Sequence, residues 1–530
     1  MRLLIFHGYL LGGTGSNVYN ARLAEALVRL GHEVHLLTQD RHPEEHEFVE
    51  AAGDWDEGAL RVHRIGGRGS ADGVPRCTVY RPDIGGLLPV YVADRYEGIE
   101  ARTFAECSDH EIAAYVDANV AAVRELVELV GPEAALANHL VMGPVILARA
   151  LSGRVPYAVK VHGSALEYTV KPQPDRFLGV AREGIAGASG VLVGSHHTAT
   201  SLWEALGDPS LERRTRLGPP GVDIATFTPR TTSAAIAGVR SLARRLRESS
   251  RAEAQGRAVE ESAFTRDAGA AATALERLDP GQDALVAFVG KLIVSKGIDL
   301  LIAAWPLVLE RVPRARLLVV GFGAYRSGVE RLLHALAAGD IAAAAGIARA
   351  GRSLETDGVE PRPLRHLLAF LDSLHGDELE RYLASARALR ERVVLSGRLE
   401  HEELPDVLPA CEALVVPSTF PESFGMVAVE AAACGVLPVS AAHSGLAEVS
   451  DELARAVPPE ATGWLSFSVD DRAVRAIADR LVAWLTADPA VRSSTRDGLV
   501  ATVRRRWSWD SVAEGVIAAA RGEIEDLHPA

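Results

Sequence analysis

The chain has 530 residues, 48% of them hydrophobic, which is enough to bury more than one core, so two domains are expected. Its formal net charge of −14 disfavours nonspecific binding to nucleic acid, because a polyanion is attracted only where positive charge dominates. No stretch approaches the ~20 apolar residues needed to cross a bilayer, and the apolar run at the N-terminus is too short for a signal peptide. The 4 cysteines form no C-x-x-C pair. We therefore expect a cytoplasmic protein without a transmembrane segment or a nucleic-acid partner.

Short apolar runs alternate with helical patterns along residues 1–218, which is typical of a doubly wound α/β domain. A first helix is expected over residues 18–30, closed by Gly31. The expected strands are residues 3–6, 33–37, 134–137, 157–161 and 190–193.

The turn-rich segment 217–223 precedes a change in composition and is the expected connection to a second domain, residues 219–505. This half repeats the α/β pattern without repeating the sequence. Its expected strands are residues 285–289, 315–320, 393–395 and 413–416.

Two intervals of the second domain, residues 231–278 and 324–392, are interpreted as helical insertions. The first is rich in alanine and arginine, with apolar residues at helical spacing: Ile236, Val239, Leu242 and Leu246. Packing on the second domain is favoured over a membrane surface. A contact between copies of the chain, or with an anionic acceptor, stays open.

A glycine-rich loop, residues 11–17, lies between the first expected strand and helix. Glycines let backbone N–H groups approach an anion, and the following helix start adds partial positive charge, so the loop could hold a phosphate. The G-x-G-x-x-G pattern fails at its sixth position, which is Val18. A tight turn without a ligand is an equal alternative.

Two lysines, Lys291 and Lys296, follow the strand expected at 285–289 and precede a helix. Ligands of α/β sheets bind at the carboxyl ends of strands, and two ammonium groups there can neutralise a diphosphate. This position favours phosphate binding over a solvated lysine pair.

The most specific segment runs from Val416 to Gly435 and contains Glu422 and Glu430. A strand, a Phe/Pro loop and a helix are expected in that order, with the amides of Phe424, Gly425 and Met426 exposed at the helix start. At 1.5 Å per residue the two carboxylates would stand ~12 Å apart, about the span from a hexose to a ribose across a diphosphate. Because Glu430 sits in an apolar run, it needs a buried partner.

Three rival patterns are weaker. Asp54-Trp55-Asp56 matches the D-x-D of metal-dependent transferases but lies in an acidic loop. Residues 42–46 match the H-x-x-E-H of zinc peptidases but contain a proline and have no companion ligand motif. Ser195 precedes two histidines without the G-x-S-x-G elbow of a hydrolase.

The order of these motifs resembles the retaining glycosyltransferases of family 4, whose GT-B fold has two Rossmann-like domains facing a cleft. The matching segments are residues 12–16, 161–164, 194–195, 219–223, 290–297, 321–323, 397–399, 417–418, 422–430 and 444–448. The C-terminal stretch, about 506–530, is similar to the segment that crosses back onto the first domain. Lys291 stands where the family more often has arginine, which keeps the charge but loses the forked grip on phosphate.

The resemblance implies roles for individual residues. Those expected to act on the reacting groups are Lys291, Lys296, Glu422 and His162. Those expected to bind the donor are Gly12, Gly13, Arg398, Leu399, Phe424, Gly425, Met426 and Glu430. Glu422 would hold the sugar, Glu430 the ribose, and His162 would lie beside the transferred sugar.

The resemblance implies a hexosyltransferase that takes a nucleotide-sugar donor, needs no metal or other cofactor, and transfers with retention to an acceptor hydroxyl. A UDP-hexose donor is weakly preferred and GDP-mannose stays open, whereas the acceptor, expected at loops within residues 61–102, is unidentified. The alternatives are a nucleotide-sugar epimerase or hydrolase of the same fold and a noncatalytic sugar-nucleotide binding protein.

Overall fold

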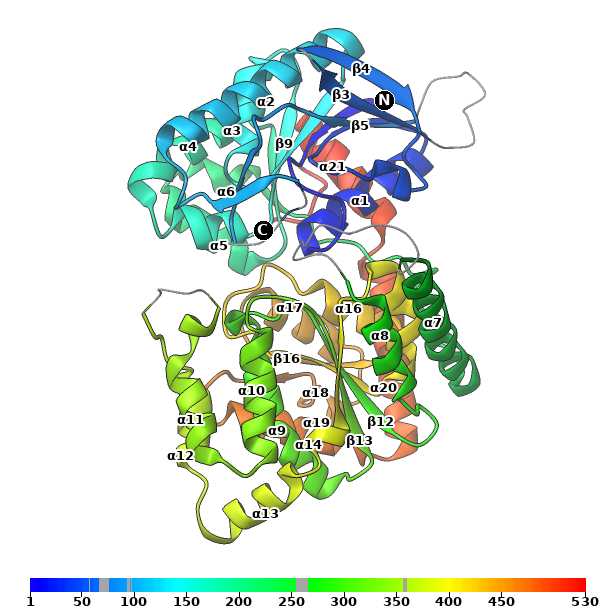
Figure 1. The fold of residues 1–530 in the computed structure, drawn as a ribbon. Coiled ribbons are helices and arrows are strands. Elements are labelled where there is room, and N and C mark those ends of the chain that lie inside the picture. Colours follow the sequence, from blue (N-terminus) through cyan, green and yellow to red (C-terminus); the bar gives the residue numbers. More distant parts are fainter. Residues whose placement is uncertain (57, 66–75, 93–95, 97, 254–265, 356–359) are drawn as a thin grey trace. The chain divides into compact units, whose positions relative to one another are not determined.

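The computed structural model describes residues 1–56, 58–65, 76–92, 96, 98–253, 266–355 and 360–530 (Figure 1). The chain divides into two compact units, residues 1–221 with 507–530, and residues 222–506. The sequence placed the division at 218/219 and the C-terminal return near 506. Parts of both expected insertions and of the expected acceptor loops lie outside the described residues. Within the described part, no helix is long and apolar enough to cross a membrane.

The first unit is built on a sheet with the strand order β11-β10-β9-β8-β1-β2-β5-β3-β4, parallel except for the β3–β4 pair. Its strands are β1 (Arg2–Phe6), β2 (Glu33–Leu37), β3 (Ala51–Asp56), β4 (Ala59–Arg64), β5 (Cys77–Arg81), β8 (Ala134–Asn138), β9 (Tyr157–Val161), β10 (Gly190–Val193) and β11 (Thr215–Leu217). A separate pair joins β6 (Leu87–Val90) to β7 (Glu100–Thr103). The segments β3 to β7 were not expected, because polar residues or a proline interrupt their apolar runs.

Helices cover both faces of this sheet because successive side chains of a buried strand point to opposite faces. Leu3 and Ile5 of β1 pack with α1 and α21, whereas Leu4 and Phe6 pack with α2, α3 and α4. The helices are α1 (Gly15–Arg29), α2 (Asp109–Val130), α3 (Gly143–Leu151), α4 (Pro174–Ala186), α5 (His196–Leu206), α6 (Ser210–Arg214) and α21 (Trp509–Arg521).

The second unit contains a six-stranded parallel sheet with the order β14-β13-β12-β15-β16-β17. Its strands are β12 (Ala284–Val289), β13 (Ala315–Val320), β14 (Val393–Gly397), β15 (Ala413–Val416), β16 (Leu437–Ala441) and β17 (Ser466–Phe467). The helices that are not part of the expected insertions are α9 (Ile298–Arg311), α15 (Leu404–Val407), α16 (Met426–Ala433), α17 (Ser444–Ala454), α18 (Pro459–Thr462), α19 (Ala473–Leu485) and α20 (Pro489–Arg506).

Helices occupy the described parts of both expected insertions. They are α7 (Thr232–Glu253), α8 (Ala268–Glu276), α10 (Arg326–Ala337), α11 (Ile341–Ala350), α12 (Arg365–Asp372), α13 (Gly376–Ala386) and α14 (Leu389–Arg392). The apolar face of α7 is buried at Val239, Leu242 and Leu246. Arg245 and Arg247, on the same helix, pair with Asp406 and Glu276. The helix therefore packs within its own unit.

The C-terminal helix α21 is part of the first unit and lies beside α1 (Figure 1). Trp509 at its start is 6% exposed, and its ring meets that of Tyr19 at 5.6 Å between centroids. Gly221 fits under the same indole, since a Cβ there would come within 2.8 Å of it. Trp509 therefore fixes the return of the chain onto this unit.

We predict that Trp509→Ala destabilises the first unit by about 3–5 kcal/mol, because it removes a large buried aromatic side chain. The measurement is amide hydrogen exchange along α1 and α21, which should lose protection together. Leu129→Ala is the matched control, because that side chain is 63% exposed. Unchanged protection of α21 would show that its docking does not depend on Trp509.

Candidate functional site

The strand order of the second sheet reverses between β12 and β15, because the chain runs from β12 outward through β13 and from β15 outward through β16. In α/β sheets such a switch point opens a crevice at the carboxyl ends of the strands, where ligands bind. The loop after β12 carries Lys291 and Lys296, and the loop after β15 carries Glu422. Lys291, Lys296 and Glu422, expected to act on the reacting groups, thus flank the switch point.

The two loops touch through a glycine. Gly297 has φ +65°, and a Cβ on it would lie 1.9 Å from the carbonyl oxygen of Pro417. The backbone N–H of Thr419 also donates to the carbonyl of Ser295 at 2.9 Å. Any side chain at position 297 would force the loops apart, so the glycine is required by both the conformation and the close approach.

Lys296 and Glu422, expected at one site from sequence, are in contact. The Lys296 ammonium pairs with Oε1 of Glu422, and the hydroxyl of Ser418 donates to the same oxygen at 2.6 Å. The two side chains are 31% and 22% exposed, so both can be reached by a ligand. Lys296 and Glu422, which are 126 positions apart in the sequence, therefore form an ion pair.

Glu422 is held from behind by the segment at the start of α17. Its backbone N–H donates to the hydroxyl of Ser444 at 2.9 Å, and the N–H of Gly445 donates to its carbonyl at 2.9 Å. A Cβ on Gly445 would come within 2.6 Å of the Ser423 carbonyl. The Ser444 segment, matched in sequence without a role, positions the Glu422 backbone.

Phe322, which the sequence did not single out as a site residue, lies between two of the expected cations. Lys291 Nζ is 5.9 Å from the centre of its ring, and Arg398 Cζ is 5.7 Å from it. The backbone N–H of Leu292 donates to the Phe322 carbonyl at 2.6 Å. Cations stack favourably on aromatic faces. Phe322 therefore brings Lys291 and Arg398 to one place.

The second inserted interval also reaches this site. Oε1 of Glu355 accepts a hydrogen bond of 2.6 Å from the backbone N–H of Val294, inside the loop that carries both lysines. Burial raises the pKa of this carboxyl above its ordinary value. The interval was interpreted as a decoration of the second domain, whereas in the structure it also fixes the lysine loop.

Glu430 is 2% exposed, and its Oε1 lies 2.7 Å from Nε2 of His401. A buried partner was expected for this carboxylate, but its identity was not, because His401 follows a different strand. The estimate of ~12 Å between the two glutamates assumed helical rise throughout. The helix α16 begins only at Met426, so that estimate does not hold for the loop part.

At the start of α16, open amides are found at two of the three expected positions, Gly425 and Met426. Gly425 caps the helix with φ +113°, and its missing Cβ leaves room for Leu446, which would otherwise lie 2.5 Å away. Within the described residues, no hydrogen bond is found for the N–H groups of Gly425 and Met426. Phe424 is buried at 6% exposure, and Leu399 after β14 at 8%. Helix N-termini of this kind attract anions.

The other expected residues belong to the first unit, at the switch point of its own sheet between β1 and β8. His162 follows β9 and is hydrogen-bonded through Nε2 to Asn138 at 2.8 Å. Gly12 accepts a hydrogen bond of 2.6 Å from the side chain of Asn17, and Gly13 adopts φ +89°. Burial, with His139 and Lys160 nearby, holds the pKa of His162 well below its ordinary value.

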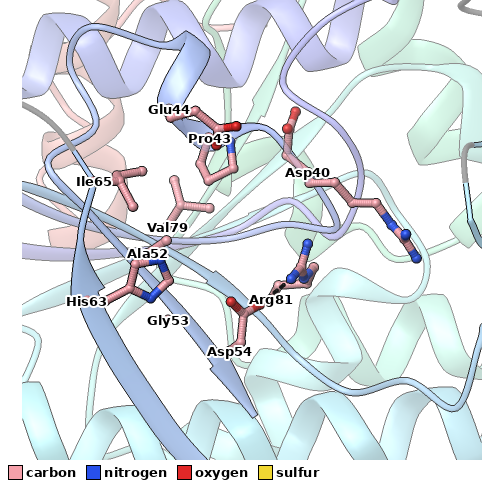
Figure 2. A pocket seen from close by; sticks show the side chains of 11 residues that line it. Asp40, Pro43, Glu44, Ala52, Gly53, Asp54, His63, Ile65, Val79 and Arg81 are labelled. Atoms are coloured by element: carbon pink, nitrogen blue, oxygen red, sulfur yellow. Dashed lines mark ion pairs between the residues drawn. The ribbon is translucent and has the colours of Figure 1, made fainter. Parts of the chain in front are cut away.

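The rival patterns have structural explanations. Asp54 and Asp56 pair with Arg81 and Arg61 at 2.7 and 3.1 Å, so both carboxylates of the D-x-D are already engaged. Asp54 and Arg81 line a cavity of about 160 Å³ beside η1 (Pro43–Glu45), shown in Figure 2. Ser195 caps α5 by accepting from the N–H of Thr198. The described residues contain no metal-binding cluster of histidine, cysteine, aspartate or glutamate.

We predict that Gly297→Ala displaces the lysine loop and destabilises the second unit by more than about 1–2 kcal/mol, the cost of a left-handed alanine alone. The free energy of unfolding and nucleotide binding should both fall. Gly346→Ala is the control, because Gly346 lies exposed in α11 with no atom within 4 Å of an added Cβ. There alanine should be neutral or stabilising. Equal effects of the two substitutions would contradict the close approach.

Two family models match the chain, one in each unit. Residues 14–221 match the glycosyl transferase 4-like domain, and residues 367–494 match the glycosyl transferases group 1 model. The chain is 29% identical over 359 residues to a D-inositol 3-phosphate glycosyltransferase of Xylanimonas cellulosilytica, covering 68% of this chain and 63% of that relative. The chain thus spans less than two thirds of that relative's length. A relative with the same name in Kineococcus radiotolerans is 26% identical, with 97% of this chain and 91% of the relative covered.

Among solved structures, HepE of Anabaena, in complex with UDP and glucose, superposes with a TM-score of 0.53 at 17% identity, covering 98% of this chain and 99% of that one. At this identity the similarity concerns the fold, which is GT-B. With a matching model in each unit and relatives of the same kind, the chain belongs to the family 4 glycosyltransferases of GT-B fold.

Proposed function

We propose that the protein transfers a hexose from a nucleotide-sugar to an acceptor hydroxyl, with retention of configuration. The observation that carries the proposal is the contact of Lys296 with Glu422 at the switch point of the second sheet. It joins a cation suited to a leaving phosphate with a carboxylate suited to sugar hydroxyls. The names of the relatives support a glycosyl transfer, and the UDP and glucose bound to HepE support the choice of a nucleotide-sugar donor.

On the phosphate side of the proposed site, several N–H groups can donate hydrogen bonds to phosphate oxygens. An ammonium group carries three N–H donors, so Lys296 can hold Glu422 and a phosphate oxygen together. Lys291 and Arg398, gathered at Phe322, supply further charge, and the amides of Gly425 and Met426 supply uncharged donors. Such preorganised donors stabilise the charge that develops on a departing diphosphate.

In the proposed mechanism the acceptor attacks the face from which the diphosphate leaves. The departing oxygen takes the acceptor proton, and the protein contributes positioning and electrostatics. Glu422 orients the hexose and Glu430 the ribose; neither acts as a nucleophile. We further propose that the lysines perform the leaving-group role that metals fill in other transferases.

A panel of UDP-, GDP- and ADP-sugars, with and without acceptors, tests this proposal against its alternatives. A transferase consumes donor only with an acceptor, an epimerase or hydrolase consumes it without one, and a sensor binds it unchanged. UDP-hexoses are the preferred donors. D-inositol 3-phosphate is the first acceptor to try, given the names of the relatives.

We also propose a cytoplasmic location, because the thiols of all the cysteines are free and buried, which fits a reducing compartment.

We predict that Lys296→Ala lowers kcat at saturating donor by about 10²–10³-fold, because it removes a donor aimed at the leaving group. Steady-state kinetics with the active pair from the panel measure this effect. Lys171→Ala is the control, since that lysine belongs to the first unit and pairs with Glu167. An unchanged kcat for Lys296→Ala would refute the assignment of leaving-group stabilisation.

We predict that His401→Ala weakens UDP binding about tenfold, because the buried Glu430 loses its hydrogen-bonded partner and its orientation. Calorimetry with UDP and with 2′,3′-dideoxy-UDP separates the ribose contribution, and the loss should be smaller for the dideoxy ligand. Adding His401→Ala to Glu430→Gln should cost little more. His375→Ala, at an exposed position, is the control. Equal losses for both ligands would show that Glu430 does not bind the ribose.

A further inference from the structure

The switch point of the first sheet contains a buried chain of polar side chains that the proposed mechanism does not use. Four of its members are nearly inaccessible: His7, Asn17, Asn20 and Asn138 are 1%, 2%, 0% and 1% exposed. His7 follows β1, Asn138 is the last residue of β8, and Asn17 and Asn20 lie in the first turns of α1. Most buried polar groups of folded proteins are hydrogen-bonded, and each of these four side chains has at least one partner.

The chain is continuous from His162 to the glycine loop. His162 Nε2 lies 2.8 Å from Asn138 Oδ1, and Asn138 Nδ2 donates to Asn20 Oδ1 at 2.7 Å. Asn20 Nδ2 lies 3.0 Å from His7 Nδ1, and His7 Nε2 lies 3.0 Å from Asn17 Oδ1. Asn17 Nδ2 then donates to the carbonyl of Gly12 at 2.6 Å.

Backbone carbonyls fix the direction of every bond in this chain, because a carbonyl can only accept. Asn138 Nδ2 also donates to the carbonyl of Phe6 at 3.2 Å, so its amide cannot be reversed. Its Oδ1 therefore faces His162, and Nε2 of that histidine must carry the proton. The Phe6 carbonyl, by fixing the amide of Asn138, thus determines the tautomer of His162.

The same argument holds further along. Asn20 Nδ2 donates to the carbonyl of Ser16 at 2.8 Å, which leaves His7 Nδ1 as the acceptor of its other hydrogen. His7 then carries its proton on Nε2, which lies 3.0 Å from both the Leu10 carbonyl and Asn17 Oδ1. If any of these asparagine amides turned over, its Oδ1 would face a backbone carbonyl, which is also an acceptor.

We propose that Asn138, Asn20 and His7 are positioning residues that lock His162 as the Nε2–H tautomer, so that its Nδ1 accepts a hydrogen bond from a substrate hydroxyl. The inference rests on the proposed function. It adds the direction of the hydrogen bond: the substrate hydroxyl donates and Nδ1 of His162 accepts. His162 is only partly buried, and within the described residues no hydrogen bond is found for its Nδ1. That nitrogen is the one left for a ligand.

The surroundings keep His162 uncharged. The groups that face it are His139 at 4.9 Å and Tyr19 at 5.0 Å between ring centres, with Lys160 and His7 nearby. None of them is an acid that would stabilise an imidazolium, and burial with these neighbours lowers the pKa of His162. His162 therefore acts as a neutral acceptor and not as a proton shuttle between pH 6 and 8.

The chain ends on the glycine loop, and this gives it a second consequence. Gly12 and Gly13 are the residues expected to lie against the donor, and the carbonyl of Gly12 is the last acceptor. A displacement of that loop removes the acceptor of Asn17 Nδ2, whereas the Ser16 and Phe6 carbonyls still hold Asn20 and Asn138. The Gly12 carbonyl thus connects the glycine loop to the chain that orients His162.

The test is NMR of the full-length protein labelled with 13C and 15N on histidine, in which the Cδ2 shift reports the tautomer. The signal of His162 is identified by its loss in His162→Gln. We expect the Nε2–H tautomer with no titration from pH 6 to 8. An Nδ1–H tautomer, or a titration in this range, overturns the proposal. This readout needs no activity, so it remains decisive if the proposed transferase function fails.

Asn138→Asp tests the role of the chain. A carboxylate cannot donate to Phe6 or Asn20, and it raises the pKa of His162, so that Nδ1 becomes protonated as the pH falls. We expect kcat/KM to drop about 10- to 100-fold and to recover as the pH rises, unlike in the wild type. Asn119→Asp, at another buried asparagine of the same unit bonded to Tyr115, should lower stability alone. If Asn138→Asp leaves the His162 signal and the pH profile unchanged, the chain does not set the tautomer.

Discussion

The candidate donor site depends on one close approach, that of Gly297 to the carbonyl of Pro417. The loops after β12 and β15 carry opposite charges and follow neighbouring strands of the sheet. Without a Cβ at position 297 they come close enough for the Lys296 ammonium to meet the Glu422 carboxylate. Glu355 and Ser444 then hold the two loops from outside. The close approach of Gly297 to Pro417 thus allows the ion pair between Lys296 and Glu422 to form.

The two units apply the same topological rule with different chemistry. In each, the polar residues follow the strands on either side of the point where strand order reverses. The second unit gathers charged groups there, whereas the first gathers amides and neutral imidazoles. A buried amide chain is directional because each asparagine has a donor end and an acceptor end. Charge suits a diphosphate, and fixed direction suits the hydroxyl groups of a sugar or an acceptor.

Sequence reasoning predicted what depends on local pattern. The bounds of β2, β9, β10, β13 and β15 follow directly from short apolar runs, and Lys296 and Glu422 were expected at one site. It missed β16, whose run contains Pro438, and the polar β3–β4 hairpin. It also missed His401, Phe322 and Asn138. Their roles depend on partners from distant strands, and no spacing in the sequence shows such partners. For Glu430 the sequence predicted that a buried partner is needed, but not which residue it is.

The charge balance of the donor site bears on how it would hold an anion. Lys291, Lys296 and Arg398 are offset by Glu422 beside Lys296 and by Glu400, which pairs with Arg398 at 2.8 Å. The net charge of these five side chains is small, so attraction alone gives little selectivity for a diphosphate over other anions. Selectivity then has to come from where the N–H groups point. The carboxylates contribute to this, because each holds a cation in one orientation while leaving its remaining donors directed toward the ligand.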